Sequence, residues 1–484
     1  MGGRFETEFD RDVLIALVRE LRRELKTAHE RIASLEQRVE ELSKRPPTTR
    51  LDESYSLKAE ERRREKQHNR KRRQKSSRRG RRTTQEKLDR AERVEVVCPD
   101  GFTADECKLH RERPVWRIEN GRAALVVYEI YRGPNGEIPT IPGLLPRSEY
   151  GLEVHVTLAF LVFIVGLSMD KVIALLKFFW ELDLPKSQAD ALLNRLARDW
   201  QGEFDALCQL LAISAVVHAD ETSWSINSVW AMLSEKARVL IFGCHKDAAT
   251  LEALLPKESF DGVLVSDDAA VYRGFSKSQK CWAHLIRKAI RLTLLEPDNT
   301  EYRRFLDGLL KVYRNACRFA ADKRFGESGR LLKVDELFNQ MCELCGDRFA
   351  DESEPTTEAG KDQRNLVQEL VRLLVDEELF TFVLHPAASG TNNEAERTLR
   401  GPAMDRRTGR TSKTIRGARR RTILVSVLES LRLHVADFTL SGVLQEVTAW
   451  TANQPGLFGR LLNSTGLAPP GSSPLAILFP LPAK

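Results

Sequence analysis

Two short apolar segments of this chain run directly into pairs of acidic residues. Asp220 and Glu221 follow AVV within HADET, and Asp267 and Asp268 follow GVLV within VSDDAAVY. The surrounding pattern reads strand, hairpin, short helix and strand, which predicts a mixed α/β core with carboxylates at two strand ends. Functional groups gather at such rims, because loops there are held by a rigid sheet. We therefore expect a site at this edge.

A third acidic stretch, TNNEAERTLR at 391–400, contains Glu394 and Glu396. Positions i and i+2 of a helix point in nearly opposite directions, so only one of these glutamates can face a given site. Clustered carboxylates need a cation to stay ionised together, and oxygen ligands suit Mg²⁺ or Mn²⁺. Two such ions can assist phosphodiester cleavage. For each place taken singly, the acids could instead start a turn or cap a helix.

The positive charge of the chain is concentrated in one segment. The formal net charge is +7, yet Lys58–Arg82 alone contains 14 Lys and Arg against 3 Glu. Such a segment cannot bury a core, so we expect a disordered linker over 46–92. Contact with nucleic-acid phosphates is the favoured interpretation, with Arg72 and Arg73 among the DNA-binding residues. A merely solvated linker is the alternative.

Apolar residues recur alternately four and three residues apart from Leu14 to Leu42. This heptad pattern predicts a coiled coil over 1–45, and hence a homodimer or a higher oligomer. A single amphipathic helix packed on its own domain is the alternative.

The remaining segments suggest further domains. Residues 93–205 read as strands and then helices, a predicted DNA-binding region; its two helices near 169–200 could form a helix-turn-helix or simply pack together. The core is expected over 206–284 and 391–450, with a helical insertion over 285–390, since 129 residues separate Asp267 from Glu396. Residues 451–484, rich in Gly, Pro and Ser, predict a flexible tail. Cys98, Cys107 and His110 could bind zinc or pack as ordinary side chains.

Cysteine use and hydropathy bear on the compartment. Eight cysteines are scattered through the chain without a dense framework, and no signal-peptide pattern is visible, which favours a reducing cytoplasm. The longest apolar run, Val156–Met169, is too short to span a bilayer, so we expect no membrane association.

Four motifs together carry a family resemblance. HADETSW, LVSDDAAVY, KCWAHLIRK and TNNEAERTLR, in this order, resemble the insertion sequence 66 family of bacterial DDE transposases, over about 142–434. The resemblance implies a ribonuclease H-like catalytic core whose Asp, Asp, Glu triad binds two divalent ions. It further implies cutting of element ends, joining of 3′-hydroxyls to target DNA, nucleoid association and possible accessory proteins encoded by the element.

The resemblance also implies individual roles. It assigns catalysis and metal binding to Asp220, to Asp267, which stands five before Tyr272, and to Glu396. Asp268 replaces the usual Gly, and its role stays open. Asn392 and Asn393 precede Glu396, whereas Arg400 follows it by four residues and could hold its carboxylate or contact a phosphate.

Two further elements accompany the triad. Cys281, Trp282 and His284 form a C-x2-H element that could support the site or contact DNA, although a buried Cys and Trp with a hydrogen-bonded His is favoured. The segment 405–421 matches a Gly-Arg-Lys-aromatic stretch of the family only loosely. DNA-backbone contact is its favoured interpretation, and a solvated loop is the alternative. The expected DNA-binding residues after Glu396 are Arg397, Arg400, Arg406, Arg407, Arg410 and Lys413.

These features together predict a DNA transposase. A nuclease with the same core but no joining step is the first alternative. A non-catalytic coiled-coil protein that binds DNA is the second.

Overall fold

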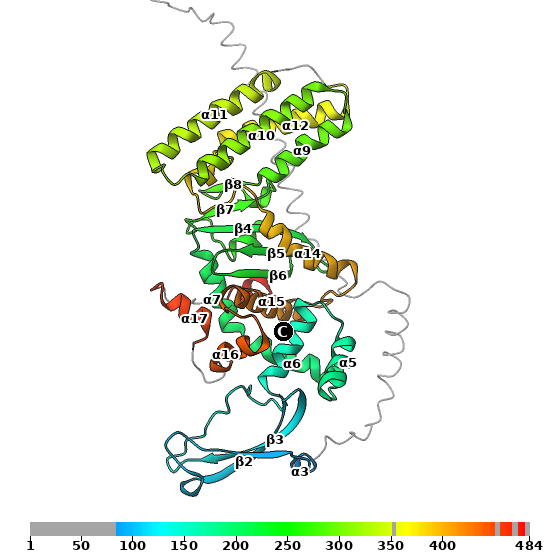
Figure 1. Ribbon diagram of the computed structural model, residues 1–484, viewed down its shortest axis with the longest axis vertical. Helices are drawn as coiled ribbons and strands as arrows, with labels where there is room; N and C mark the ends of the chain where they lie inside the picture. The colour runs from blue at the N-terminus through cyan, green and yellow to red at the C-terminus, as the bar shows by residue number, and fades with distance from the viewer. Residues whose placement is uncertain (1–83, 351–354, 451–454, 467–472, 480–484) are drawn as a thin grey trace, which may run out of the picture. The chain divides into compact units, whose positions relative to one another are not determined.

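A five-stranded mixed sheet is the centre of the protein (Figure 1). The computed structural model describes residues 84–350, 355–450, 455–466 and 473–479, so the predicted coiled coil and Arg72 and Arg73 lie outside the described residues. The strands are β4 (Val216–Ser223), β5 (Ser228–Leu233), β6 (Arg238–Cys244), β7 (Val263–Ser266) and β8 (Ser278–Lys280), in the order β6-β5-β4-β7-β8. The predicted mixed α/β fold is confirmed.

The sheet changes direction at β4. Strand β5 runs antiparallel to both of its neighbours, β4 and β6, whereas β7 and β8 run parallel to β4. The short helix α8 (Ala248–Glu252) lies in the connection from β6 to β7. Because β4 and β7 are parallel neighbours, their carboxyl ends lie at the same edge of the sheet.

Helix α15 (Ile415–His434) closes the β6 edge with a row of hydroxyl groups. The backbone N–H groups of Arg238, Leu240 and Phe242 donate to Ser430 Oγ, Ser426 Oγ and Thr422 Oγ1 at 2.9, 2.9 and 3.0 Å. The hydroxyl groups recur every four residues of the helix, and they contact every second residue of the strand. The helical and strand repeats therefore stay in register over three contacts. An edge strand that could otherwise pair with another chain is thereby covered.

The segment before the core contains a second sheet, which is followed by four α-helices and a π-helical turn. β1 (Arg93–Val97), β2 (Lys108–Glu119) and β3 (Arg122–Arg132) form a sheet in the order β1-β3-β2. Asn120 and Gly121, both with positive φ, make the tight turn between β2 and β3. Helix α4 (Leu152–Ala159), the π-helical turn η2 (Phe160–Ile164), α5 (Met169–Trp180), α6 (Lys186–Asp199) and α7 (Gln201–Ala212) follow.

Five helices between β8 and α14 (Asn393–Arg407) have a hydrophobic core of their own. They are α9 (Trp282–Leu295), α10 (Thr300–Ala321), α11 (Glu327–Ala350), α12 (Glu358–Val375) and α13 (Thr381–Leu384) (Figure 1). Val263 and Val265 of β7 belong to the same apolar cluster, so this helical segment packs onto one face of the sheet.

The described parts of the C-terminal segment differ from the predicted flexible tail. After α16 (Leu440–Trp450), α17 (Leu457–Asn463) and α18 (Pro474–Leu478) each bury apolar side chains, among them Phe458 and Leu475. Glu203 of α7 accepts hydrogen bonds from the backbone N–H groups at the start of α17. The Gly and Pro residues mark turns between short packed helices. Composition alone does not distinguish such packed helices from a flexible tail.

Of the predicted disordered linker over 46–92, residues up to 83 lie outside the described residues, and residues 84–92 include regular structure. Residues Thr84–Leu88 form the short helix α3, and Lys87 within it pairs with Glu149 at 2.8 Å. No helix in the described part of the chain is long and apolar enough to cross a membrane.

Candidate active site

The parallel pairing of β4 and β7 brings two of the predicted acids to one edge of the sheet. His218 lies opposite Val265 in this pairing, so Asp220 and Asp267 each stand two residues further along their strands. Asp267 directly follows β7, where its Oδ1 accepts a hydrogen bond from the backbone N–H of Ala269 at 3.0 Å. The two carboxylates therefore come from neighbouring strand ends.

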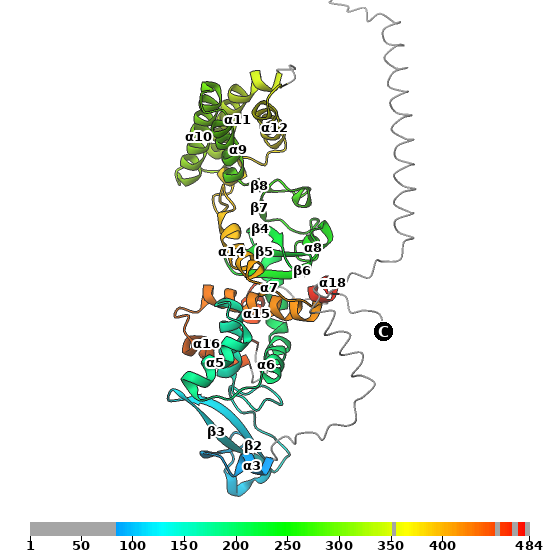
Figure 2. The ribbon, with the colours of Figure 1, turned by 90° about the vertical axis from the view of Figure 1, so that its right-hand side faces the viewer.

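Strand alternation separates the two acids of HADET. Neighbouring residues of a strand point to opposite faces, so Asp220 and Glu221 cannot share a site. Glu221 accepts a hydrogen bond from the Tyr272 hydroxyl and pairs with Lys246. Asp220 instead lies on the face that interacts with Glu396 of α14. Figure 2 shows α14 and α8 on opposite sides of the sheet.

The start of α14 is fixed against β4 by the buried side chain of Asn392. Its Nδ2 donates to the backbone carbonyl of Ala219 at 2.7 Å, and its Oδ1 lies 3.3 Å from His218 Nδ1. Its backbone N–H donates to Cys281 Sγ at 3.1 Å. These contacts join the end of β4, the start of α9 and the start of α14. The orientation of Glu396 therefore depends on both strands and helices around it.

The two glutamates of α14 have different partners, as helix geometry requires. Glu394 pairs with Arg238 of β6 at 2.9 Å. Glu396 pairs with Arg287 of α9 at 2.7 Å. Arg400, which sequence reasoning offered as a partner for Glu396, contacts no carboxylate among the described residues. The cation that holds Glu396 therefore comes from α9 rather than from one turn along α14.

Burial and neighbouring acids raise the pKa of Asp220. The pKa of Asp220 is raised to about 7, first by burial and then by the charge of Glu221, with further contributions from Asp267 and Glu396. A hydrogen bond from the backbone N–H of Glu221 opposes part of this rise. A divalent cation would relieve this repulsion, and carboxylate oxygens are the ligands that Mg²⁺ and Mn²⁺ prefer.

Asp268, whose role the sequence left open, turns toward the inserted helices. Its carboxylate pairs with Arg372 of α12, close to the buried ammonium of Lys280. The neighbouring acids Asp267 and Asp268 thus serve different contacts. A cavity of about 400 Å³ lies beside them. Its charged and polar lining residues are Asp267, Asp268, Lys280, His284, Lys288, Glu369 and Arg372.

The residues predicted to support the site separate into two groups. Trp282 is fully buried in the core of the inserted helices, and its indole N–H donates to the Leu379 carbonyl at 2.8 Å. Cys281 and His284 instead lie beside Glu396, and the ligand atoms of all three fall within 4.8 Å of one another.

Cys98, Cys107 and His110 form no such group in the described part of the chain.

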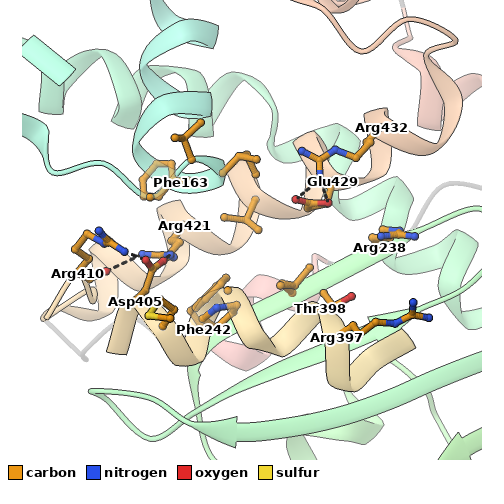
Figure 3. Close-up of a pocket in the computed structure, with 18 of the residues that line it drawn as sticks. Phe163, Arg238, Phe242, Arg397, Thr398, Asp405, Arg410, Arg421, Glu429 and Arg432 are labelled. Atoms are coloured by element: carbon orange, nitrogen blue, oxygen red, sulfur yellow. Dashed lines mark hydrogen bonds and ion pairs between the residues drawn. The ribbon is translucent and has the colours of Figure 1, made fainter. Parts of the chain in front are cut away.

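The predicted DNA-binding residues also divide. Arg397, Arg400, Arg407 and Lys413 are exposed. Arg406 instead donates to the backbone carbonyl of Ser223 at 2.6 Å. Arg410 pairs at 3.1 Å with the buried Asp405, which also pairs with Arg421 (Figure 3). Arg406 and Arg410 are therefore occupied within the protein, because the loop after α14 folds back onto the core.

The basic side of α14 borders a second, larger cavity. This cavity of about 580 Å³ lies between η2, β6, α14 and α15 (Figure 3). Arg397 and Thr398 of α14 line it together with Arg238 and the Glu429–Arg432 pair. The exposed arginines 397, 400 and 407 of α14 fall within about 80° on a helical projection; Arg400 and Arg407 point within about 40° of Glu396, and Arg397 points about 100° from it. We call these three the α14 arginine stripe.

Sequence reasoning missed several residues that shape this site. Arg287 follows His284 by three residues, so its place on the same face of α9 could have been inferred. The contacts of Lys246 and Arg372 join segments far apart in the chain, and no local pattern indicates them.

One comparison with known proteins gives a match. The family model described as "Transposase IS66 family" matches residues 147–420, more than half of the chain and a range that includes all three predicted acids. No curated protein matches the chain.

Proposed function

The chain belongs to the IS66 family of transposases, and from that premise we propose that it cuts insertion-sequence ends and joins the freed 3′-hydroxyls to target DNA. Asp220, Asp267 and Glu396 are the proposed catalytic residues. The observation that carries this proposal is geometric: the parallel pairing of β4 and β7 puts Asp220 and Asp267 at neighbouring strand ends, and α14, which carries Glu396, packs against β4.

We further assign the sheet to the ribonuclease H-like class. The order β6-β5-β4-β7-β8, with three antiparallel strands followed by two parallel ones, supports this assignment. In this arrangement Asp220 lies on the central strand, Asp267 ends its parallel neighbour, and Glu396 is supplied by a helix packed across β4 and β5.

Two divalent ions, either Mg²⁺ or Mn²⁺, would be held by Asp220, Asp267 and Glu396. The half-buried Asp220 has a raised pKa and three acidic neighbours, which is the environment that a bound cation stabilises. Bound ions of this kind supply positive charge to the attacking and leaving oxygens of a phosphodiester. Asn392 fixes the start of α14, and Arg287 holds the Glu396 carboxylate toward α9.

The α14 arginine stripe is the proposed contact for the DNA backbone beside these acids. Its three guanidinium groups are exposed; Arg397 and Arg400 lie within about one turn of Glu396 along the helix, and Arg407 lies about three turns from it. Lys413 and the basic segment that contains Arg72 and Arg73 would add phosphate contacts, although the latter lies outside the described residues. Arginine suits this role because its planar donors match phosphate oxygens.

For the first residues of the chain we propose the oligomerisation domain expected from sequence. A coiled coil over 1–45 would pair two copies, so that one assembly holds two DNA ends. Deleting residues 1–45 should then reduce the molecular mass measured by light scattering to that of a monomer. An unchanged mass would assign oligomerisation to another segment.

Strand transfer separates this function from that of a nuclease with the same core. Protein, Mg²⁺ and DNA carrying the element ends should give products covalently joined to a target plasmid, and Asp220→Asn should abolish both cutting and joining. Cutting without joined products would favour the nuclease. Equal cutting by Asp220→Asn would remove Asp220 from the site.

A further inference from the structure

A second kind of metal-ligand set adjoins the proposed catalytic acids. Cys281, His284 and Glu396 offer a sulfur, a nitrogen and an oxygen, and these atoms lie within 4.8 Å of one another. Among the described residues no other three His, Cys, Asp or Glu side chains meet this limit, so Asp220, Asp267 and Glu396 are spaced more widely as a set. Thiolate and imidazole ligands suit Zn²⁺, whereas Mg²⁺ prefers oxygen alone.

The backbone holds these ligands in place. Cys281 is the N-cap of α9, and His284 lies within the first turn of the same helix. Glu396 lies within the first turn or so of α14, and Asn392 at the start of α14 donates its N–H to Cys281 Sγ at 3.1 Å. Both helices therefore present their N-terminal ends to the cluster.

One nitrogen in the cluster has no hydrogen-bond partner. His284 Nδ1 is buried and unpaired among the described residues, and it lies 3.6 Å from Glu396 Oε1. That separation is too long for a hydrogen bond. It is close to the distance between two ligands of a tetrahedral zinc ion, which is about 3.4 Å for bonds of about 2.0–2.1 Å.

We propose that Cys281, His284 and Glu396 bind Zn²⁺, with water as the fourth ligand. The bound ion would coordinate His284 Nδ1, the nitrogen without a hydrogen-bond partner. It would also displace Arg287 from Glu396. Small rotations of the three side chains would bring their ligand atoms from the 4.8 Å limit to tetrahedral spacing.

The consequence for activity rests on the proposed function of Glu396. A carboxylate that binds zinc beside α9 is withdrawn from the oxygen-ligand site that it forms with Asp220 and Asp267. Zinc would therefore act as an inhibitor that competes for one shared ligand. The binding itself does not depend on catalysis, and the two claims can fail separately.

Cobalt substitution tests the binding directly, because Co²⁺ occupies zinc sites and a thiolate–cobalt bond gives a charge-transfer absorption band. The full-length Asp220→Asn protein is titrated with Co²⁺ and then with Zn²⁺. We expect the band to appear at one cobalt per chain and to be lost when zinc is added. Since this variant lacks a proposed catalytic acid, the result is independent of DNA cleavage.

Two variants and one control assign the ligands. Cys281→Ser should abolish the band, and His284→Gln should weaken cobalt binding at least tenfold, so this variant still tests the site if the Cys281→Ser protein does not fold. The control is Cys107→Ser. Cys107 lies near Cys98, beside the sheet of β1, β2 and β3, and this variant should keep the band. Absence of the band in Asp220→Asn, or its persistence in Cys281→Ser, would overturn the proposal.

Discussion

At the scale of single residues, the two acids of HADET differ because a strand alternates its faces. The sequence suggested Asp220 through family resemblance, and strand alternation gives the physical reason for that choice. Glu221 lies with Tyr272 and Lys246 on the other face. By contrast, Arg400 of α14 was one candidate partner for Glu396, and the partner is Arg287 of α9. The local spacing of residues in the sequence does not indicate an ion pair between two helices that are distant in the chain.

The raised pKa of Asp220 predicts a pH-dependent stability. Its carboxyl group has an ordinary pKa of 3.8 and a folded pKa of about 7, so the folded state binds the proton more tightly. The stability that this proton contributes is complete below about pH 4 and is lost as the pH rises through 7. Without divalent metal, Asp220→Asn should therefore be more stable than the wild type at pH 8, by on the order of 1–3 kcal/mol.

Urea unfolding of both proteins from pH 4 to pH 8 measures this difference. The gap between the two free energies of unfolding should grow as the pH rises, and Mg²⁺ should narrow it by stabilising the wild type alone. A gap that is constant across this range would show that Asp220 titrates normally.

At the scale of elements, α15 depends on hydroxyl groups that meet the edge strand β6. Ser426 is fully buried and both donates to and accepts from the backbone of Leu240. Ser426→Ala would leave the Leu240 N–H buried without a partner, which costs about 1–3 kcal/mol. Ser464→Ala, at an exposed position after α17, should change the free energy of unfolding by less than about 0.5 kcal/mol. Equal effects of the two substitutions would contradict the proposed role of the hydroxyl row.

This contact illustrates a signal that was present in the sequence but incomplete. Thr422, Ser426 and Ser430 recur every four residues within an otherwise apolar helix, so a shared polar contact could have been inferred. The strand that they meet lies almost 190 residues earlier, and no spacing identifies it.

The α14 arginine stripe predicts a change in the salt dependence of DNA binding. Each phosphate contact contributes about 0.9 to the slope of log affinity against log salt. Replacing Arg397, Arg400 and Arg407 by alanine should therefore reduce the magnitude of this slope by about 2 to 3. Arg324→Ala, an exposed arginine paired with Asp322 in the inserted helices, should leave the slope unchanged. Fluorescence anisotropy over a salt series provides the measurement, and an unaltered slope in the triple variant would exclude the stripe.

At the scale of the whole molecule, the sequence predicts the order of the parts better than their boundaries. The α/β core and the helical segment between Asp267 and Glu396 follow from periodicity and from the length of the interval. The packed helices α17 and α18 were missed, because Gly- and Pro-rich segments resemble linkers until buried residues such as Phe458 are seen in contact. The contact of Arg372 with Asp268 likewise joins the inserted helices to the acidic edge through tertiary structure alone.

In the proposed active site Glu396, and not Glu394, acts together with Asp220 and Asp267. The most direct test compares Glu396→Gln with Glu394→Gln in the strand-transfer assay, since the two glutamates share a helix and differ in the face they occupy. Glu396→Gln should reduce joining by more than about 100-fold, beyond the 10–100-fold cost of losing an outer partner of a metal ligand. Glu394→Gln should retain joining within a few-fold of the wild type. Equal losses in both variants, or joining that survives Glu396→Gln, would contradict this account.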